Sequence, residues 1–278
     1  MRVSFALFFL AAGFHAAAQQ EPSASLRPPP TLDEQRVILA RVGLESLRYQ
    51  RELPNLVCTQ LTVRSVDQTG TGKHWKRRDR LEVEDAYVDP FLNHKLLMFN
   101  GRDPHKTYQQ LTGLLSETVL HSVGFLPRWI FGPQSKAKFE WRNWSDIDGR
   151  LVHVFSVRVP AADSRLVVTT DKQSLVAGID GLIYVDAAAF LVRRLEFQME
   201  LPAQSVIQDG VIKIDFGGVT ISERQFLLPL KAEVTARVDG SLERNQTEVV
   251  RYQRYGAEST LHFDDSSEGA PPNESPPR

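Results

Sequence analysis

Apolar and polar residues alternate with a period of two over most of the chain, and this pattern predicts β-strands. The alternation is clearest over residues 195–201, 212–216 and 232–238. A period of two places alternate side chains on opposite faces of a strand. One apolar and one polar face is typical of an antiparallel sheet with one face in water, since buried parallel strands would be apolar throughout. We expect about nine to eleven strands.

Turn residues separate the strand-like segments and predict hairpins between them. Gly70-Thr71-Gly72, Asp148-Gly149, Asp180-Gly181 and Asp239-Gly240 all fall between alternating runs. Glycine accepts a positive φ angle at little steric cost, so Asp-Gly pairs suit tight turns. We therefore expect a turn at each of these positions.

A helix is predicted over residues 31–49, ahead of the strands. Thr31 and Glu34 have the spacing of a capping box, in which each side chain accepts a hydrogen bond from the other's backbone. Pro54 ends the helical pattern because it lacks the N–H that a continuing helix needs. The apolar stripe expected to face the core consists of Val37, Ile38, Val42 and Leu47.

Residues 111–131 are the one long exception to strand patterning after the first helix. Helical spacing relates Leu111, Leu114, Leu115, Val119, Leu120 and Val123. More apolar residues follow, namely Phe125, Leu126, Trp129, Ile130 and Phe131, interrupted by Pro127. We predict an α+β fold: a curved, mainly antiparallel half-barrel sheet with an N-terminal helix and this inserted helical segment packed on its concave face.

The ends of the chain predict export and flexible termini. Arg2, a short apolar run and Ala16-Ala17-Ala18 have the order of a secretory signal peptide over residues 1–18. Residues 19–30 form a proline-rich leader, and residues 264–278 form an acidic tail rich in proline and serine. Residues 31–263 are expected to form a single domain without an internal linker. No other apolar run is long enough to span a membrane in the mature chain.

Cysteine usage favours a bacterial periplasm over a eukaryotic extracellular space. The single cysteine, Cys58, cannot form an intrachain disulfide. Position 19 holds glutamine, where a lipid-anchored bacterial protein would carry cysteine at the cleavage point. The glycosylation patterns at Asn143 and Asn245 are then chance matches. The expected location is periplasmic or secreted.

Composition and charge are those of an ordinary globular protein. The 278 residues are 42% hydrophobic and 24% charged, with a formal net charge of -1. Nothing in this balance calls for a nucleic-acid partner.

Four segments resemble the periplasmic half-barrel family that includes the LolA- and LolB-type lipoprotein carriers and the sensor domain of RseB. These are residues 178–186, residues 192–196 with their Arg-Arg-Leu-Glu, and residues 226–229 leading into 231–234. The resemblance extends over about 31–263. It implies a hydrophobic cavity between the sheet and the helices, and no catalytic residues.

The residues show no established catalytic or metal-binding motif, and we expect no cofactor. No histidines have metal-ligand spacing, and both the Gly-x-Ser-x-Gly elbow and a phosphate loop are missing. Cys58 lies in an apolar strand, where it is either a small buried hydrophobe or a nucleophile paired in space with a histidine. Asp146 and Asp148 are either a hydrolytic carboxylate pair or turn-capping residues before Gly149.

A basic run around Trp75 is a candidate anionic-surface site. Its members are Lys73, Lys76, Arg77, Arg78 and Arg80. They either grip the phosphates of lipid headgroups or of a polyanion, or form a solvated strand face with ion pairs to the acids that follow.

Segment 111–131 is either a plug that completes the core or a movable lid over an acyl-chain cavity. The candidate lid residues are Leu114, Leu115, Val119, Leu120, Phe125, Trp129 and Phe131. The predicted function is a non-catalytic exported protein that binds a lipid, a lipoprotein acyl chain or another apolar ligand. The alternatives are an envelope sensor or scaffold that binds another protein and, with less support, an exported hydrolase.

Overall fold

The computed structural model describes residues 27–88, 91–114, 126–170 and 174–256. Helix α1 spans Leu32–Glu52, and the short helix α3 spans Leu126–Phe131. Single 3₁₀ turns lie at η2 (Tyr108–Gln110), which precedes α3, and at η3 (Pro133–Ser135) and η4 (Ala161–Asp163), which follow it. The strands are β1 (Leu56–Asp67), β2 (Lys76–Val88), β3 (Phe91–Phe99), β4 (Lys138–Ile147), β5 (Arg150–Val159), β6 (Leu166–Thr169), β7 (Ser174–Asp186), β8 (Val192–Glu200), β9 (Ile207–Ile221), β10 (Arg224–Val238) and β11 (Ser241–Arg254).

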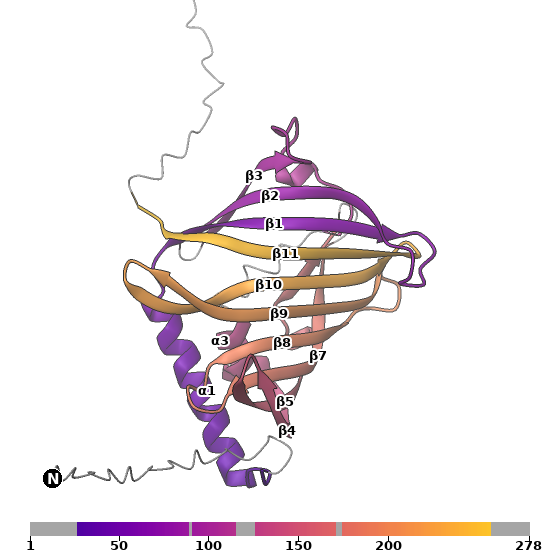
Figure 1. The fold of residues 1–278 in the computed structure, drawn as a ribbon. Helices are drawn as coiled ribbons and strands as arrows, with labels where there is room; N and C mark the ends of the chain where they lie inside the picture. The colour runs from indigo at the N-terminus through magenta and orange to yellow at the C-terminus, as the bar shows by residue number, and fades with distance from the viewer. Residues whose placement is uncertain (1–26, 89–90, 115–125, 171–173, 257–278) are drawn as a thin grey trace, which may run out of the picture.

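The strands form one antiparallel sheet in the order β3-β2-β1-β11-β10-β9-β8-β7-β5-β4, and β6 pairs with β7 beside this path. The first strand, β1, pairs with the last strand, β11, in the interior of the sheet. The sheet curves around α1 and α3, with β3 and β4 at its two edges (Figure 1). Strand β4 carries a bulge between Trp141 and Asn143. The predicted open, curved sheet of about nine to eleven strands with an N-terminal helix is confirmed.

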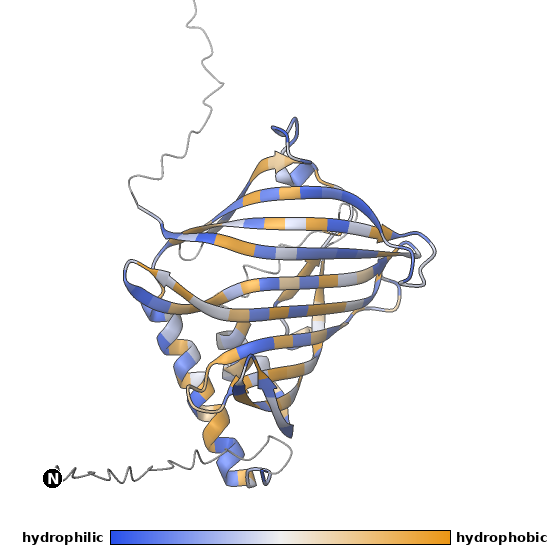
Figure 2. Ribbon diagram, in the orientation of Figure 1, coloured by the Kyte–Doolittle hydropathy of each residue, from blue (hydrophilic) through white to orange (hydrophobic). Residues whose placement is uncertain are grey.

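Apolar and polar residues alternate along the strands as the period of two predicts (Figure 2). Residues 195, 197 and 199 of β8 and 232, 234, 236 and 238 of β10 are all buried. They pack in one large core with Ile38 and Val42 of α1 and with Trp129 and Ile130 of α3. The helices therefore shelter the apolar side of β5 and β7–β10, and this burial is the main source of the fold's stability.

A second, smaller core lies under the other part of the sheet. Leu81 and Val83 of β2 and Leu96 of β3 are buried there against Tyr108 and Leu111. The chain segment around η2 therefore covers β2 and β3 as α1 and α3 cover the rest of the sheet.

The capping box of α1 is confirmed, while its buried face differs from the predicted stripe. The Glu34 backbone N–H donates to Thr31 Oγ1, and the Thr31 N–H donates to a Glu34 carboxylate oxygen at 2.7 Å. Val37 is 55% exposed and Leu47 37% exposed, although both were expected to face the core. Only one side of α1 meets the sheet and α3, and this contact is narrower than the apolar stripe.

Two other sequence predictions are wrong. Asp180-Gly181 lies inside β7 instead of forming a turn. A Cβ atom at Gly181 would come within 2.1 Å of the Glu196 carbonyl oxygen of β8, so the glycine permits a close approach of two strands. Residues 111–114 are not helical, although helical spacing was expected there, whereas Leu126–Phe131 form α3 with Pro127 in its first turn, where proline is tolerated.

Candidate functional site

The inner face of the sheet changes from apolar to polar where β1, β2 and β11 lie side by side. On this face, alternate positions of the three strands carry polar side chains that are all buried. They are Gln60, Thr62, Arg64, Asp79, Asp85, Glu243, Asn245 and Thr247. Buried polar groups are costly unless hydrogen bonds satisfy them, so the partners of these residues show what this strip does.

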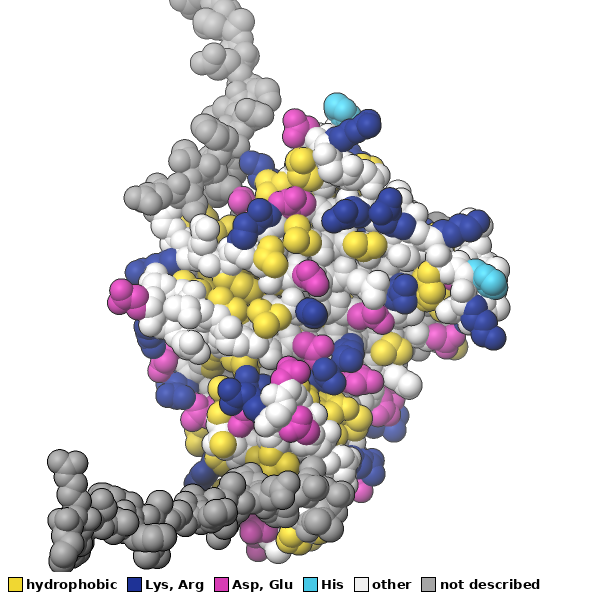
Figure 3. All heavy atoms as spheres, viewed as in Figure 1, with side chains coloured by type: hydrophobic (Ala, Val, Ile, Leu, Met, Phe, Trp, Pro, Cys, Tyr) yellow, Lys and Arg dark blue, Asp and Glu magenta, His cyan; other side chains and the backbone are white. Residues whose placement is uncertain are grey.

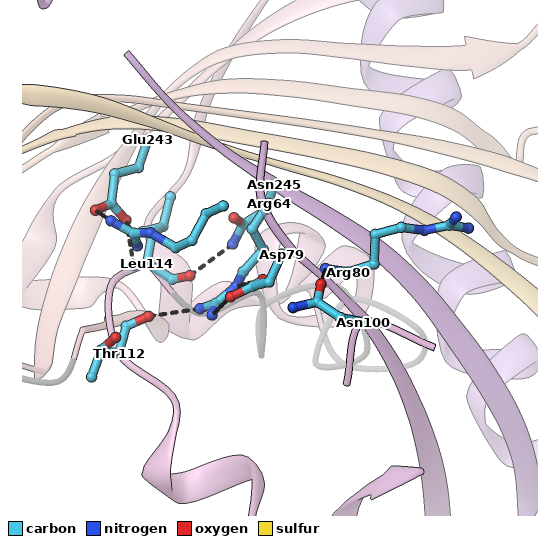
Figure 4. A network of polar contacts seen from close by, with 9 residues as sticks. Arg64, Asp79, Arg80, Asn100, Thr112, Leu114, Glu243 and Asn245 are labelled. Carbon is cyan, nitrogen blue, oxygen red and sulfur yellow. Dashed lines mark hydrogen bonds and ion pairs between the residues drawn. The ribbon is translucent and has the colours of Figure 1, made fainter. Parts of the chain in front are cut away.

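Arg64 connects the sheet to the segment that covers it. Its Nε and Nη2 atoms donate to the two carboxylate oxygens of Asp79 at 2.7 and 2.5 Å. Its Nη1 atom donates to the backbone carbonyl of Thr112 at 2.7 Å. Only 3% of the Arg64 side chain and 5% of the Asp79 side chain are exposed. The ion pair therefore aims one further guanidinium donor at the covering chain (Figure 4).

Strand β11 holds the same segment two residues further on. The Leu114 N–H donates to Glu243 Oε2 at 2.7 Å, and Asn245 Nδ2 donates to the Leu114 carbonyl at 2.9 Å (Figure 4). Arg78 of β2 forms a two-bonded ion pair with the same Glu243 carboxylate. Both polar backbone groups of Leu114 are thus satisfied by side chains of the sheet.

Gly113, between these two anchor points, has a φ angle of +82°. A Cβ atom there would lie 1.9 Å from Arg78 Nη1 and 2.8 Å from Glu243 Oε2. Glycine is therefore required both by the backbone conformation and by the nearby ion pair. We call Arg64, Asp79, Arg78, Glu243 and Asn245, with residues 112–114 that they hold, the latch.

The structure describes three of the seven candidate lid residues. Leu114, which belongs to the latch, is fully buried, Trp129 is buried in the main core, and Phe131 stacks on Phe139 with ring centroids 5.1 Å apart. The others, Leu115, Val119, Leu120 and Phe125, lie outside the described residues. Both described ends of segment 111–131 thus pack against the sheet. Residues 112–114 are held by hydrogen bonds, and residues 126–131 are held by apolar packing.

Two of the hollows that described residues line lie between the sheet and the covering segments, and both are small. One, of about 10 Å³, lies between strands β1, β2 and β11 and the side chain of Tyr108. The other, of about 30 Å³, lies between α1, Pro127 and the sheet residues Val192, Phe216 and Leu227. Neither is much larger than a water molecule.

A second polar group on the inner face involves Cys58 and a histidine. The register places Asp85 opposite Cys58 and His94 opposite Asp85, in a row across β1, β2 and β3. His94 Nδ1 lies 2.5 Å from Asp85 Oδ1, and Gln60 Nε2 donates to the other carboxylate oxygen. Burial raises the pKa of the Cys58 thiol, which favours the unreactive protonated form. Asp85 separates this thiol from the histidine, so the row supports a buried hydrogen-bond network and no nucleophile.

The other candidate chemistry also has a structural role. The Gly149 N–H donates to Asp146 Oδ1 at 2.8 Å, which confirms that this carboxylate caps a hairpin turn. His153 is buried against Trp144, with ring centroids 4.1 Å apart, and burial lowers its pKa to about 4. Among the described residues, no three histidine, cysteine or acidic side chains cluster in a way that fits a metal ion.

The basic run divides between the two faces of the sheet. Lys73, Lys76, Arg77 and Arg80 are exposed, whereas Arg78 turns inward to Glu243. The acids that follow in the sequence are occupied elsewhere: Glu82 pairs with Arg251, and Asp85 with His94. Helices long and apolar enough to cross a membrane are absent from the part of the chain that is described.

No family model and no curated protein matches this chain. Solved structures similar to it include a putative outer membrane lipoprotein-sorting protein domain from Vibrio parahaemolyticus, at 9% identity and a TM-score of 0.40, covering 82% of this chain and 94% of that one. A DUF1329 family protein from Desulfovibrio piger has 8% identity and a TM-score of 0.40, with 83% and 97% covered. A LolA superfamily protein from Nitrosomonas europaea has 8% identity and a TM-score of 0.35, with 80% and 93% covered. A LolA superfamily protein, of the family that the sequence was expected to resemble, is thus among the solved structures similar to this chain.

Proposed function

We propose that this protein is an exported, non-catalytic binding protein that holds a lipid, a lipoprotein acyl chain or another apolar ligand between the concave face of the sheet and segment 111–131. The latch is the observation that supports this proposal. A buried ion pair adds less stability than well-packed apolar side chains of the same volume, but it fixes one position for the groups that it binds. A permanent plug would be held more simply by apolar packing, as α3 is.

The ligand site proposed here needs the covering segment to shift. Small-molecule sites have volumes of about 300–1,000 Å³, far above the hollows of about 10 and 30 Å³ beneath the described cover. Entry of an acyl chain therefore requires the hydrogen bonds to Thr112 and Leu114 to break. The residues proposed to contact the ligand are Leu114, Leu115, Val119, Leu120, Phe125, Trp129 and Phe131.

Native mass spectrometry of protein purified from a bacterial host tests this function, together with titration by a fluorescent fatty acid. We expect a bound apolar molecule or saturable uptake that unlabelled fatty acid reverses. Val119→Asp with Leu120→Asp should weaken uptake at least tenfold. The matched control, Val167→Asp with Val176→Asp, changes two valines that are each 45% exposed and should leave uptake unchanged. A clean unliganded mass and no uptake would reject carriage.

The latch supplies an independent readout for the same function. Glu243→Gln weakens the acceptor for the Leu114 N–H and removes the charge that pairs with Arg78. We expect faster fatty-acid uptake and faster amide hydrogen exchange at Leu114 in this variant. Unchanged uptake with faster exchange would mean that the latch has a structural role only.

A second candidate function is an envelope scaffold or sensor that binds another protein. The small hollows under the described cover favour it, as does an open groove of about 1,100 Å³ on the outer face of the sheet. Crosslinking in cells separates the two functions, because a scaffold would trap a protein and a carrier would trap a lipid.

A further inference from the structure

One end of the outer sheet face carries a concentration of positive charge. We define the basic patch as the exposed residues Lys73, Arg77 and Arg80 together with the half-buried Arg244. The register places Arg77 and Arg244 on either side of Ser65, so residues from β2 and β11 meet across β1. Figure 3 shows Lys and Arg side chains along this end of the face, near the turn between β1 and β2. The patch therefore combines residues that are far apart in the sequence.

Strand alternation turns two of the neighbouring acids away from this face. Asp79, between two patch residues in the sequence, points inward to Arg64, and Glu243, next to Arg244, points inward to Arg78. Among the described residues, no carboxylate lies within ion-pair distance of Lys73, Lys76, Arg77 or Arg80. In Figure 4 the Arg80 guanidinium extends away from the latch network. The latch thus holds Asp79 and Glu243 on the inner face, so these two acids do not offset the charge of the basic patch.

The turn that carries part of the patch is held in place by a buried carboxylate. Asp67 is fully buried and accepts hydrogen bonds from the backbone N–H groups of Thr69, Lys73 and His74. The Thr69 hydroxyl also donates to this carboxylate and is the largest of the contacts that lower its pKa. The backbone at Lys73 is therefore already ordered before any partner binds.

Trp75 lies between this turn and the patch. Its indole Nε1 donates to the Gly72 carbonyl at 2.9 Å, and the Arg244 guanidinium lies 4.3 Å from the centre of its ring. An indole with a polar edge beside several cations suits the boundary between a membrane and water, where tryptophan is enriched. The same groove also holds acids, of which Glu82 lies two residues beyond Arg80 and pairs with Arg251. The cations without a carboxylate partner therefore lie toward the turn end of this face.

We propose that the basic patch docks the protein on the anionic headgroups of a phospholipid membrane, with the β1–β2 turn toward the lipid. The cations of the basic patch are spread over one end of the sheet. An extended surface that carries many phosphates can contact several of them at once, whereas a single small anion cannot. Each lysine or arginine near such a surface strengthens binding about fivefold. This docking is independent of whether the concave face carries a ligand.

Co-sedimentation with vesicles tests the proposal on the purified mature chain. We expect binding to vesicles of phosphatidylcholine with 30% phosphatidylglycerol, little binding to phosphatidylcholine alone, and loss of binding in 0.5 M salt. Arg77→Gln with Arg80→Gln should weaken binding roughly 25-fold, from about fivefold for each charge. The matched control, Arg36→Gln with Arg48→Gln, removes two exposed charges from α1 and should bind like the unaltered chain.

Three results would overturn the proposal: no binding to the anionic vesicles, equal binding to neutral vesicles, or equal weakening by the control pair. Circular dichroism of each variant shows that the fold is retained, and both patch residues are exposed, so unfolding is not expected. Fatty-acid uptake measured on the same variants separates this surface from the proposed function, because patch variants should leave uptake in vesicle-free solution unchanged.

Discussion

The buried pair of Arg64 and Asp79 gives the sharpest test of the interior. Arg64→Met removes the guanidinium and leaves the Asp79 carboxylate buried without its partner, while Asp79→Leu leaves the guanidinium in the same position. Removing one member of a buried ion pair costs about 3–5 kcal/mol. Each single variant should therefore lose about that much of a total stability of about 5–15 kcal/mol.

The double variant should be more stable than either single variant. With Met and Leu facing each other, neither charge of this pair is left buried, and the main remaining cost is the Thr112 carbonyl that has lost its donor. An unsatisfied buried acceptor costs about 1–3 kcal/mol. We therefore expect the double variant to lose about 1–3 kcal/mol, where independent effects would add to about 6–10 kcal/mol.

Urea unfolding at pH 7, followed by tryptophan fluorescence, measures these free energies. The ion pair of Arg158 and Glu200, which spans β7 from β5 to β8, is the matched control, because its side chains are 61% and 35% exposed. Arg158→Met and Glu200→Leu should each change stability by less than about 1 kcal/mol. Additive losses in the Arg64 and Asp79 variants would refute the reasoning, since they would mean that the two groups do not share one buried interaction.

Three further predictions follow from single contacts. Burial lowers the pKa of His153 to about 4, so its contribution to stability is present above pH 6.5 and lost as the pH falls through about 4. In urea unfolding, the His153→Phe variant should therefore lose less stability than the unaltered chain when the pH is lowered from 7 to 4.5. An equal loss in the two proteins would contradict this. Gly113→Ala should cost more than about 1 kcal/mol, because the φ angle of +82° and Arg78 both oppose a Cβ atom; an unchanged melting temperature would count against it. Thr31→Ala should cost about 1 kcal/mol through loss of the cap, measured by thermal unfolding.

Much of the fold could be predicted because strand alternation is a local property. The run of residues 232–238 already separates its inner from its outer side chains, and the capping box at Thr31 is complete within four residues. The turn predicted at Asp180-Gly181 was wrong because the same residue pair suits either a tight turn or a close contact between strands. Only the neighbouring strand β8 decides between the two, and its position is not visible in the local sequence.

The latch could not be predicted because its members come from three separate parts of the chain. Arg64 and Asn245 lie opposite each other only because β1 pairs with β11, which joins segments about 180 residues apart. A signal was nevertheless present: the inward positions of β1 change from Leu56 and Cys58 to polar Gln60, Thr62 and Arg64. A strand that places charged residues at expected core positions indicates a polar contact that another segment must complete.

The bulged edge strand β4 has a consequence for the protein at high concentration. An open sheet ends in unpaired backbone groups, onto which a copy of the same chain can add its own strand. Lys138, Glu140 and Arg142 are exposed on β4, and the bulge after Trp141 disturbs the regular spacing that such addition needs. High protein concentration would otherwise favour stacking of copies edge to edge, and these charges with the bulge keep that edge from acting as a template for aggregation.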